Sequence, residues 1–585
     1  MAGGGAVPAP RGAAGAGRLI RTVAQLRPGQ VAARARLRAQ RTALGRDLPM
    51  ARRWLLPDGE AAAAVGWPAA FRPLDAIAPS AGADLRGGDV TVLGQTRAVA
   101  PVGDAGADWA RADWELAAAP LLWRFHLYYW DWAWGLEAKD ERARCPDVWR
   151  SWQAAVRPGR GAAWHPYPAS VRAWSWCGVY RPLAEGTAIE AAFRAQLGLH
   201  AGFLRRHLET DVGGNHLIKN LKALAGLAVF FADDALLAWA VGRLRRQLAV
   251  QVLPDGGHYE RAPAYHCQVL GDLIDVAGLL RAAGRDEPGE LAGTIEAMRR
   301  WLGSVLSPDG DVPLLNDGFP VSPELVAALG PAPGPEAALV VLPDSGVARA
   351  SVGRWRLLAD IGPPCPRELP AHAHADTLGC LVHLDGEPLL IDTGTSTYEP
   401  GTVRDHQRST SAHNTLEIDQ TDSTEVWGAF RAGRRARVSR VSTAEADGVV
   451  KIGAAHDGYR GRPGRPVHHR RWRLSADELR VDDTVAGRGR HRIAVRWYLA
   501  PDTAVLLVPG GAVVTAKTGE FDVTVTAIRP AEVALTVERA EAAAGFGRTA
   551  CVLVLTGVVQ SDLPVRISTV WRLRGGRQSP EEEPA

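Results

Sequence analysis

The chain has 585 residues, of which 46% are hydrophobic and 23% are charged, the composition of a globular protein with two or three domains. Its net charge of +4 is too small to argue for nucleic-acid binding. Six scattered cysteines without a Cys-x-x-Cys pair predict neither a disulfide framework nor a cysteine zinc site. No apolar run is long enough to span a membrane.

The first 105 residues predict an N-terminal extension with a small irregular region. Residues 1–17 are rich in Gly and Ala and are expected to be disordered. Residues 18–45 carry Arg and apolar residues at helical spacing, which predicts a surface helix. Residues 46–105 are rich in Pro and Gly, with short strand-like pieces. The N-terminus lacks the continuous apolar core of a secretory signal, which favours a cytoplasmic location.

Residues 106–335 predict a helical domain. Similar helical segments are separated by turns rich in Gly, Pro and Asp, and this series is typical of a helical toroid or solenoid. The segments are 123–134, 188–208, 216–231, 234–251, 265–282 and 290–306.

Residues 340–577 predict an antiparallel β-sandwich. After a Pro-rich stretch at 331–335 the apolar pattern changes to a period of two, with Gly and Asp at the turns. The expected strands include 347–361, 377–384, 388–392, 414–419, 434–442, 449–455, 468–475, 478–485 and 493–499. The fold class is therefore multidomain α+β, an (α/α) toroid followed by an antiparallel β-sandwich. The last residues, 575–585, are polar and expected to be disordered.

Twenty tryptophans exceed the ten phenylalanines and nine tyrosines. Flat sugar faces stack on indoles, but core packing is the default interpretation for most of these side chains.

A first motif, Gly213-Gly214-Asn215-His216, opens a predicted helix. Asn215 is a reasonable helix N-cap, which would be a structural role. The functional alternative is a polar pair at a helix N-terminus, where the helix dipole and side-chain donors favour an anionic group.

A second motif runs from Asp255 to His266 and includes Tyr259, Glu260, Arg261 and Tyr265. A turn, an extended piece and a helix beginning near Pro263 place Tyr265 in the first helical turn. A tyrosine there is commonly a packing residue, but near cationic groups it can donate or accept a proton.

A third motif contains His372, His374, Asp392 and His413. Histidines at i and i+2 of an extended segment point to the same face. Two interpretations stay open: a polar network of strand histidines, or a zinc or catalytic cluster.

Together these motifs resemble the heparinase II/III family of polysaccharide lyases. Gly-Asn-His at 214–216, the run at 255–266 and His-Ala-His-Ala-Asp at 372–376 match the family pattern, and the segments at 389–394 and 408–415 complete the match. The resemblance covers roughly residues 110–500. It implies a toroid followed by a β-sandwich, with the active site between the two domains.

The resemblance also implies roles for individual residues. Asn215 and His216 match positions that bind and neutralise a uronate carboxylate, and Tyr265 matches the catalytic tyrosine. His372 matches a histidine that acts as base or assists the tyrosine. The implied substrate-binding set further includes Glu260, Arg261 and Arg408. His374, Asp392 and His413 match the ligands of a structural zinc.

The expected activity is therefore β-elimination in a glycan that contains uronic acid, such as a glycosaminoglycan, with an acidic polysaccharide as the partner. Two alternatives remain: a carbohydrate-binding or exopolysaccharide-assembly protein without activity, and a glycoside hydrolase. A hydrolase normally needs two carboxylates at the scissile bond, whereas these motifs are rich in His, Tyr and Asn.

Overall fold

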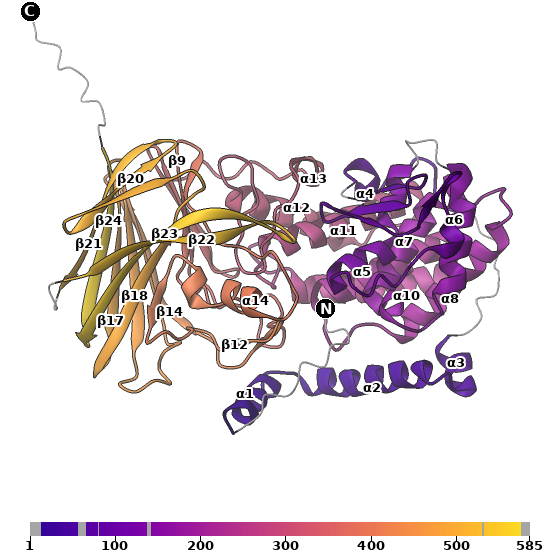
Figure 1. Cartoon of the computed structure of the whole chain (residues 1–585), viewed down its shortest axis with the longest axis horizontal. Helices are drawn as coiled ribbons and strands as arrows, with labels where there is room; N and C mark the ends of the chain where they lie inside the picture. Colours follow the sequence, from indigo (N-terminus) through magenta and orange to yellow (C-terminus); the bar gives the residue numbers. More distant parts are fainter. Residues whose placement is uncertain (1–12, 57–65, 80, 137–141, 529–531, 575–585) are drawn as a thin grey trace, which may run out of the picture.

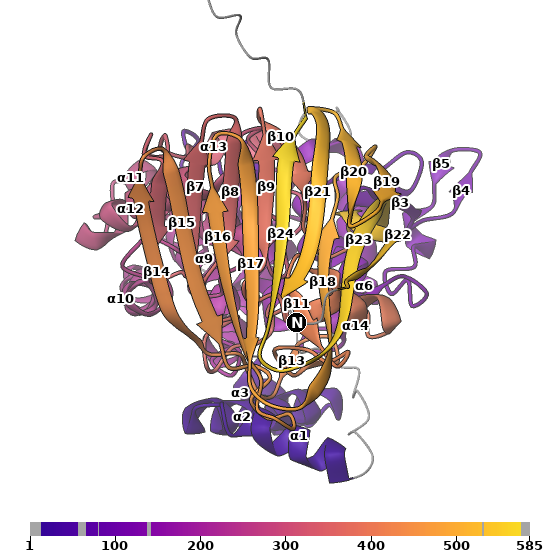
Figure 2. The ribbon, with the colours of Figure 1, turned by 90° about the vertical axis from the view of Figure 1, so that its left-hand side faces the viewer.

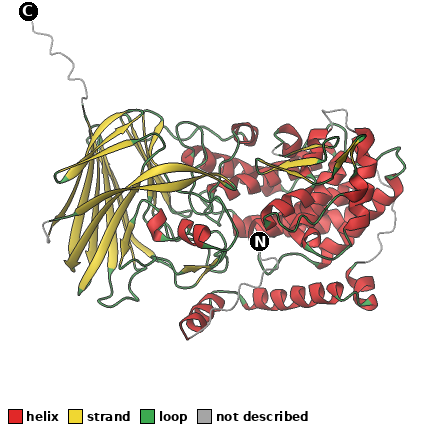
Figure 3. Cartoon of the chain, in the orientation of Figure 1, coloured by secondary structure: helices red, strands yellow, loops and turns green. Residues whose placement is uncertain are grey.

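The structure is a computed structural model that describes residues 13–56, 66–79, 81–136, 142–528 and 532–574. Helices dominate the N-terminal part and antiparallel strands the C-terminal part, and the two parts lie side by side along the long axis (Figures 1 and 3). The predicted fold class, a helical toroid followed by a β-sandwich, is confirmed. The expectations of disorder at residues 1–12 and 575–585 lie outside the described residues.

Three N-terminal helices lie along the underside of the molecule: α1 (Ala13–Val23), α2 (Pro28–Gly45) and α3 (Pro49–Leu55). The prediction of one helix over 18–45 was wrong in two respects. Residues 13–17, expected to be disordered, belong to α1, and α1 ends at Val23, with Arg27 extended (φ −72°, ψ 143°) before α2 begins. Arg27 precedes Pro28, and a proline disfavours the helical conformation of the residue before it.

The next segment forms the expected short strands. They are β1 (Gly82–Asp84), β2 (Asp89–Val92) and β3 (Gln95–Ala98), which form one small sheet, and the pair β4 (Val102–Gly103) and β5 (Gly106–Ala107). A one-turn helix, α4 (Leu74–Ile77), precedes them.

The helical domain is built around α9, which packs against α7, α8, α10 and α11, and α12 packs on α11. The helices are α5 (Leu121–Tyr129), α6 (Cys145–Ala155), α7 (Pro166–Leu183), α8 (Glu190–Arg206), α9 (Gly214–Phe230), α10 (Asp234–Gln251), α11 (Pro263–Ala282), α12 (Gly289–Val305) and α13 (Pro323–Leu329).

Two helical predictions fail for identifiable reasons. The expected helix over 123–134 ends at Tyr129, because Trp130 adopts a left-handed conformation (φ 58°) and a 3-10 helix follows. Helices α6, α7 and α13 were not predicted. In α7, thirteen of the eighteen residues are buried, so its sequence lacks the apolar stripe that reveals a surface helix.

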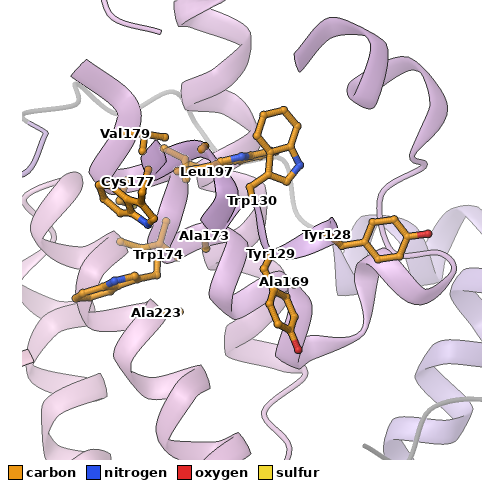
Figure 4. Close-up of a cluster of buried hydrophobic side chains, with 14 of the residues drawn as sticks. Tyr128, Tyr129, Trp130, Ala169, Ala173, Trp174, Cys177, Val179, Leu197 and Ala223 are labelled. Carbon is orange, nitrogen blue, oxygen red and sulfur yellow. The ribbon is translucent and has the colours of Figure 1, made fainter. Parts of the chain in front are cut away.

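Tryptophans form much of the core of the helical domain (Figure 4). Trp130 packs against Trp132, Trp152 and Trp176 with ring centroids 4.6–6.1 Å apart. The core-packing interpretation is therefore correct for this group. The buried Arg172 lies among these rings, 4.8 Å from that of Trp152, and burial lowers its pKa to about 9.

The C-terminal domain contains three main antiparallel sheets (Figure 2). The eight-stranded sheet has the order β14-β15-β16-β17-β24-β21-β20-β19, the five-stranded sheet β10-β9-β8-β7-β6, and the four-stranded sheet β11-β18-β23-β22. The strands are β6 (Leu339–Leu342), β7 (Val347–Val352), β8 (Trp355–Asp360), β9 (Cys380–Leu384), β10 (Glu387–Leu390), β11 (Leu416–Ile418), β12 (Val426–Trp427), β13 (Arg431–Ala432), β14 (Val438–Ala446), β15 (Val449–His456), β16 (Val467–Leu474), β17 (Glu478–Ala486), β18 (Arg490–Tyr498), β19 (Ala504–Val508), β20 (Gly511–Ala516), β21 (Gly519–Ile528), β22 (Ala534–Gly545), β23 (Arg548–Asp562) and β24 (Val565–Leu573).

The apolar faces of the sheets share one core, to which Trp355, Trp472, Trp497 and Trp571 contribute. The strand expected over 347–361 is in fact two, β7 and β8, joined by a tight turn at Gly353 (φ 56°). Because the turn is short, the period-two pattern continues across it.

Two further features concern the whole molecule. The β22–β23 hairpin reaches the helical part, where Gln95 Nε2 donates a hydrogen bond of 3.0 Å to the carbonyl of Phe546. No helix in the described ranges combines the length and the apolarity needed to cross a bilayer.

Candidate active site

Four of the predicted site residues lie together where the two domains contact each other: Asn215, Glu260, Tyr265 and His372. Helices α9 and α11 contribute their N-terminal ends, and the β-domain contributes the segment between β8 and β9. The loop between α12 and α13 lies between them and carries Asp317.

The first motif forms the start of α9, but Asn215 is not its N-cap. Gly213 holds that position with φ 73°, and Asn215 is the second residue of the helix. The N-cap interpretation of Asn215 is therefore wrong. Gly214, also left-handed with φ 57°, has no room for a side chain, because a Cβ there would lie 2.1 Å from Glu260 Oε1.

Glu260 uses this space to bind the helix start. Its Oε1 accepts a hydrogen bond of 2.7 Å from the backbone N–H of Asn215, whose side-chain amide donates to both carboxylate oxygens at 3.2 and 3.1 Å. The buried carboxylate faces the positive end of the α9 dipole. Burial alone would raise the pKa of Glu260, but His372, His258 and these donors lower it to about 2.

His216 points to a separate carboxylate. Its Nδ1 lies 2.9 Å from Glu209 Oε1, and its ring centroid lies 4.5 Å from that of Tyr167. Glu209 is fixed by Asn220, whose side-chain amide donates to Glu209 Oε2 at 3.0 Å. The structure thus brings His216 to the same helix end as Asn215 but gives it a different partner.

Tyr265 lies in the first turn of α11, as the sequence predicts. Its ring stacks on His372 with centroids 3.8 Å apart, and its hydroxyl lies 2.7 Å from the hydroxyl of Tyr398. Burial, with smaller contributions from Tyr398 and Asp317, raises the pKa of Tyr265 well above its ordinary value. Tyr265 is therefore protonated at rest.

His372 has a carboxylate at each ring nitrogen. Its Nε2 lies 3.0 Å from Glu260 Oε2, and its Nδ1 lies 2.9 Å from Asp317 Oδ2. Burial lowers the pKa of His372, but these two carboxylates outweigh burial and raise it. Because both nitrogens face acceptors, the geometry favours an imidazolium that donates two hydrogen bonds.

Asp317 connects this group to a second histidine. Its Oδ1 lies 2.8 Å from His374 Nε2, and Arg404 Nη2 donates to its Oδ2 at 2.9 Å. Both histidines contact the same carboxylate, although they lie in a turn and loop before β9 and not in the extended strand that the sequence predicted. Sequence reasoning missed Asp317 and Arg404. The only signal for Asp317 was an Asn-Asp-Gly turn between two predicted segments.

The predicted roles of two arginines are not supported by their contacts. The guanidinium of Arg261 donates to the carbonyls of Asp344 and Ser345, and that of Arg408 donates to the carbonyls of Ala373, Gly428 and Arg431. Both side chains hold loops of the β-domain in place.

The predicted zinc ligands lie close together but do not surround one point. His413 Nδ1 lies 2.8 Å from Asp392 Oδ2, and the rings of His374 and His413 are 5.3 Å apart. His374 Nδ1 and His413 Nε2 are buried and have no hydrogen-bond partner. Within the described part of the chain, no group of three or more His, Cys, Asp or Glu side chains is placed to hold a metal ion.

We call Asn215, Glu260, Tyr265, His372 and Tyr398 the interdomain cluster. Its members are at most 6% exposed. Phe546 from the β22–β23 hairpin packs 5.1 Å from Tyr398, and Phe319 packs 5.7 Å from Tyr265. A buried, hydrogen-bonded group of Asn, Tyr and His thus lies between a helical toroid and a β-sandwich, in a protein of the toroid-plus-sandwich class.

Comparisons with known proteins agree with this class. The heparinase II/III N-terminal family model matches residues 129–329, and the heparinase II/III-like C-terminal model matches residues 334–570. The chain belongs to the heparinase II/III family. No curated protein sequence matches the chain.

Solved structures show the same fold. A crystal structure of heparinase III aligns with a TM-score of 0.68 and 16% identity, covering 82% of this chain and 81% of that one. A heparan sulfate lyase from Pedobacter heparinus aligns with a TM-score of 0.57 and 17% identity, covering 81% and 79% of the two chains.

Proposed function

We propose that the protein is a polysaccharide lyase that cleaves a glycan containing uronic acid by β-elimination. The observation that carries the proposal is the convergence of Asn215, Tyr265 and His372 from two domains into one buried cluster. Structural relatives named heparinase III and heparan sulfate lyase support glycosaminoglycans as the first substrates to test.

The reaction first needs a more acidic proton at C5. Hydrogen bonds to the uronate carboxylate provide this, because they stabilise the negative charge that develops when the C5 proton leaves. The Asn215 amide, the start of α9 and His372 are the groups suited to this task. In this structure Glu260 accepts from Asn215 and His372 at 3.0–3.2 Å, so a uronate carboxylate has to replace Glu260 as the acceptor of these donors.

Tyr265 is suited to the proton transfers. When the C5 proton and O4 lie on the same side, the phenol gives its proton to O4 and accepts the proton from C5. The C4–O4 bond breaks, a C4–C5 double bond forms, no water is consumed and Tyr265 returns to its starting state. The contacts of His372 favour the assisting role over the base role, since both of its nitrogens already face carboxylates.

We retain the structural zinc as a proposal for His374, Asp392 and His413. It is supported by the two buried imidazole nitrogens without partners and by the Asp392 carboxylate beside His413. A zinc there would cross-link segments of the β-domain. None of the proton transfers above depends on it.

The test is a panel of soluble polymers that contain uronic acid, scored for the ultraviolet absorbance of the unsaturated product. Heparan sulfate, hyaluronan, alginate and bacterial exopolysaccharides belong in the panel. Absorbance that rises in step with chain cleavage supports the lyase. New reducing ends without the chromophore would establish a hydrolase, and tight binding without cleavage would establish a binding or assembly protein.

A further inference from the structure

The three N-terminal helices present a surface that the proposed lyase chemistry does not use. We infer that helices α1–α3 form a docking surface for an anionic lipid bilayer, which the protein contacts without spanning. The inference is carried by exposed apolar side chains and by an excess of arginine on the same helices.

The apolar side chains of these helices are unusually exposed. Seven of the sixteen large hydrophobic side chains that are exposed in the described chain lie between residues 13 and 56. They are Leu19, Ile20, Val23, Val31, Leu48, Met50 and Trp54, and the most exposed are Met50 (84%), Trp54 (74%) and Ile20 (68%). Large apolar side chains that are exposed together on one helix mark an interaction surface.

Their spacing gathers them on single helix faces. Leu19, Ile20 and Val23 fall within about 100° of one another around α1, while Thr22 of the same helix is buried. Met50 and Trp54 are four residues apart on α3 and share a face. Helix α2 buries only Gln30, Leu37 and Leu44, so the rest of its surface is free to contact a partner.

The charge of the same segment is strongly positive. Residues 13–56 contain ten arginines, no lysine and a single acidic residue, Asp47. Arg36, Arg38, Arg46 and Arg53 form no ion pair with any residue that the structure describes. A groove along the C-terminal half of α2 is lined by Ala35, Arg38, Ala39, Thr42, Ala43, Arg46 and Leu48. Arginine beside small and apolar side chains is the composition of helices that lie in a membrane interface.

Other partners for the surface of α1–α3 fit these observations less well. A second copy of the chain would bring arginine-rich helices against each other, and like charges oppose such an interface. An acidic polysaccharide would neutralise the arginines but would leave Ile20, Leu19 and Met50 in water. An anionic bilayer satisfies both the charge and the aliphatic side chains.

The surface is also connected to the proposed active site. Gln30 of α2 donates to the carbonyls of Asp211 and Glu368, each at 3.4 Å, and Arg27 pairs with Glu368. Asp211 precedes the start of α9, and Glu368 precedes His372. A protein docked through α1–α3 would therefore hold the interdomain cluster in a fixed orientation to the bilayer.

The experiment is co-sedimentation of the full chain with phosphatidylcholine vesicles, with and without phosphatidylglycerol. We expect binding only to the anionic vesicles, and weaker binding at high salt because the charges are screened. Met50→Ser/Trp54→Ser should weaken binding at least about tenfold, because two apolar side chains are no longer buried. Arg36→Gln/Arg38→Gln should weaken it by about tenfold or more through lost charge.

The matched control is Leu506→Ser/Leu507→Ser on β19, where the two leucines are 66% and 43% exposed. This variant should bind like the wild type. The inference would be overturned by equal binding to neutral and anionic vesicles or by no binding to anionic vesicles. It would also be overturned if the control variant lost as much binding as the α3 and α2 variants. Binding to soluble acidic glycan that survives Met50→Ser/Trp54→Ser, without vesicle binding, would assign the surface to polysaccharide. Cleavage of soluble polymers should be unchanged in all these variants, so this test and that of the lyase proposal fail independently.

Discussion

His372 and His374 are two residues apart and contact the same carboxylate, yet their surroundings differ. His372 has a carboxylate at both nitrogens and a raised pKa, whereas His374 has one at Nε2 only, and burial lowers its pKa to about 3. The first environment favours the charged imidazole and the second the neutral one. A neutral imidazole with a free nitrogen is what a metal ligand requires.

This difference separates two kinds of site within one short segment. Glu260 approaches His372 from the helical domain, so the interdomain cluster exists only when both domains are in place. The ring of His374 lies 5.3 Å from that of His413, which pairs with Asp392, and both of these residues belong to the β-domain. The proposed chemistry therefore depends on contacts between the two domains, whereas the proposed zinc ligands all belong to the β-domain, although Asp317 of the helical domain also contacts His374.

The largest effect should come from the interdomain cluster. Tyr265→Phe removes only a hydroxyl, so the chain should fold normally while kcat falls by about two to four orders of magnitude. The measurement is the rate of formation of the unsaturated product. Tyr459→Phe is the matched control, because the Tyr459 hydroxyl donates to the carbonyl of Leu416 at 2.8 Å in the β-domain and lies outside the interdomain cluster. A Tyr265→Phe variant with wild-type kcat would remove Tyr265 from the mechanism.

The members of these sites were largely visible in the sequence, because Asn215, Tyr265, His372 and His374 occur in motifs with recognisable spacing. The partners that hold them were not. Asp317 is a single carboxylate in a loop, and its role arises only when three distant segments meet around it. The roles predicted for Arg261 and Arg408 failed to gain support for the same reason, since a sequence does not show which carbonyls a guanidinium will face.

The secondary structure was predictable where one face of a helix or strand is buried and the other is exposed to solvent. Strands such as β16 and β17 alternate buried and partly exposed residues, so their period-two pattern is clear. Helix α7 is buried on nearly all sides and shows no such contrast. The end of α5 depends on one left-handed residue, Trp130, for which the sequence carries no glycine signal.

Asp317→Asn should affect both sites at once. It removes the negative charge that faces Arg404, His372 and His374, and breaking a buried ion pair in this way costs about 3–5 kcal/mol of folding stability. Denaturant unfolding measures this loss, and kcat should fall as well because His372 loses one anchor.

The matched control for Asp317 is Asp483→Asn. Asp483 is equally buried and contacts Arg470 and His468 in the β-domain, away from the interdomain cluster. The Asp483→Asn variant should lose about as much folding stability as Asp317→Asn, while its folded fraction keeps the wild-type kcat. If both variants keep kcat, Asp317 serves the fold alone.

His374→Ala tests the other side of the comparison. Purified wild-type protein should contain about one zinc, which the variant should lose together with about 1–3 kcal/mol of stability, because Asp317 Oδ1 loses a partner. Metal analysis and thermal unfolding measure the two effects. His468→Ala, which removes a buried histidine paired with Asp483, should lower stability without changing the zinc content. Metal-free wild-type protein of full stability would leave His374 and His413 as a polar network.

The smallest effect should come from Tyr398→Phe, which tests how much the hydrogen bond between Tyr398 and Tyr265 contributes to the reaction. The variant removes the hydroxyl 2.7 Å from that of Tyr265 and leaves both rings and their packing in place. A hydrogen bond between neutral groups contributes about 0.5–1.5 kcal/mol, so kcat should fall by no more than about tenfold. Tyr459→Phe is the matched control, because the Tyr459 hydroxyl donates to the carbonyl of Leu416 at 2.8 Å in the β-domain core. It should show a similar loss of stability with unchanged kcat. A loss of kcat in Tyr398→Phe as large as that in Tyr265→Phe would show that the proton passes through both hydroxyls, and the mechanism would then require the pair instead of Tyr265 alone.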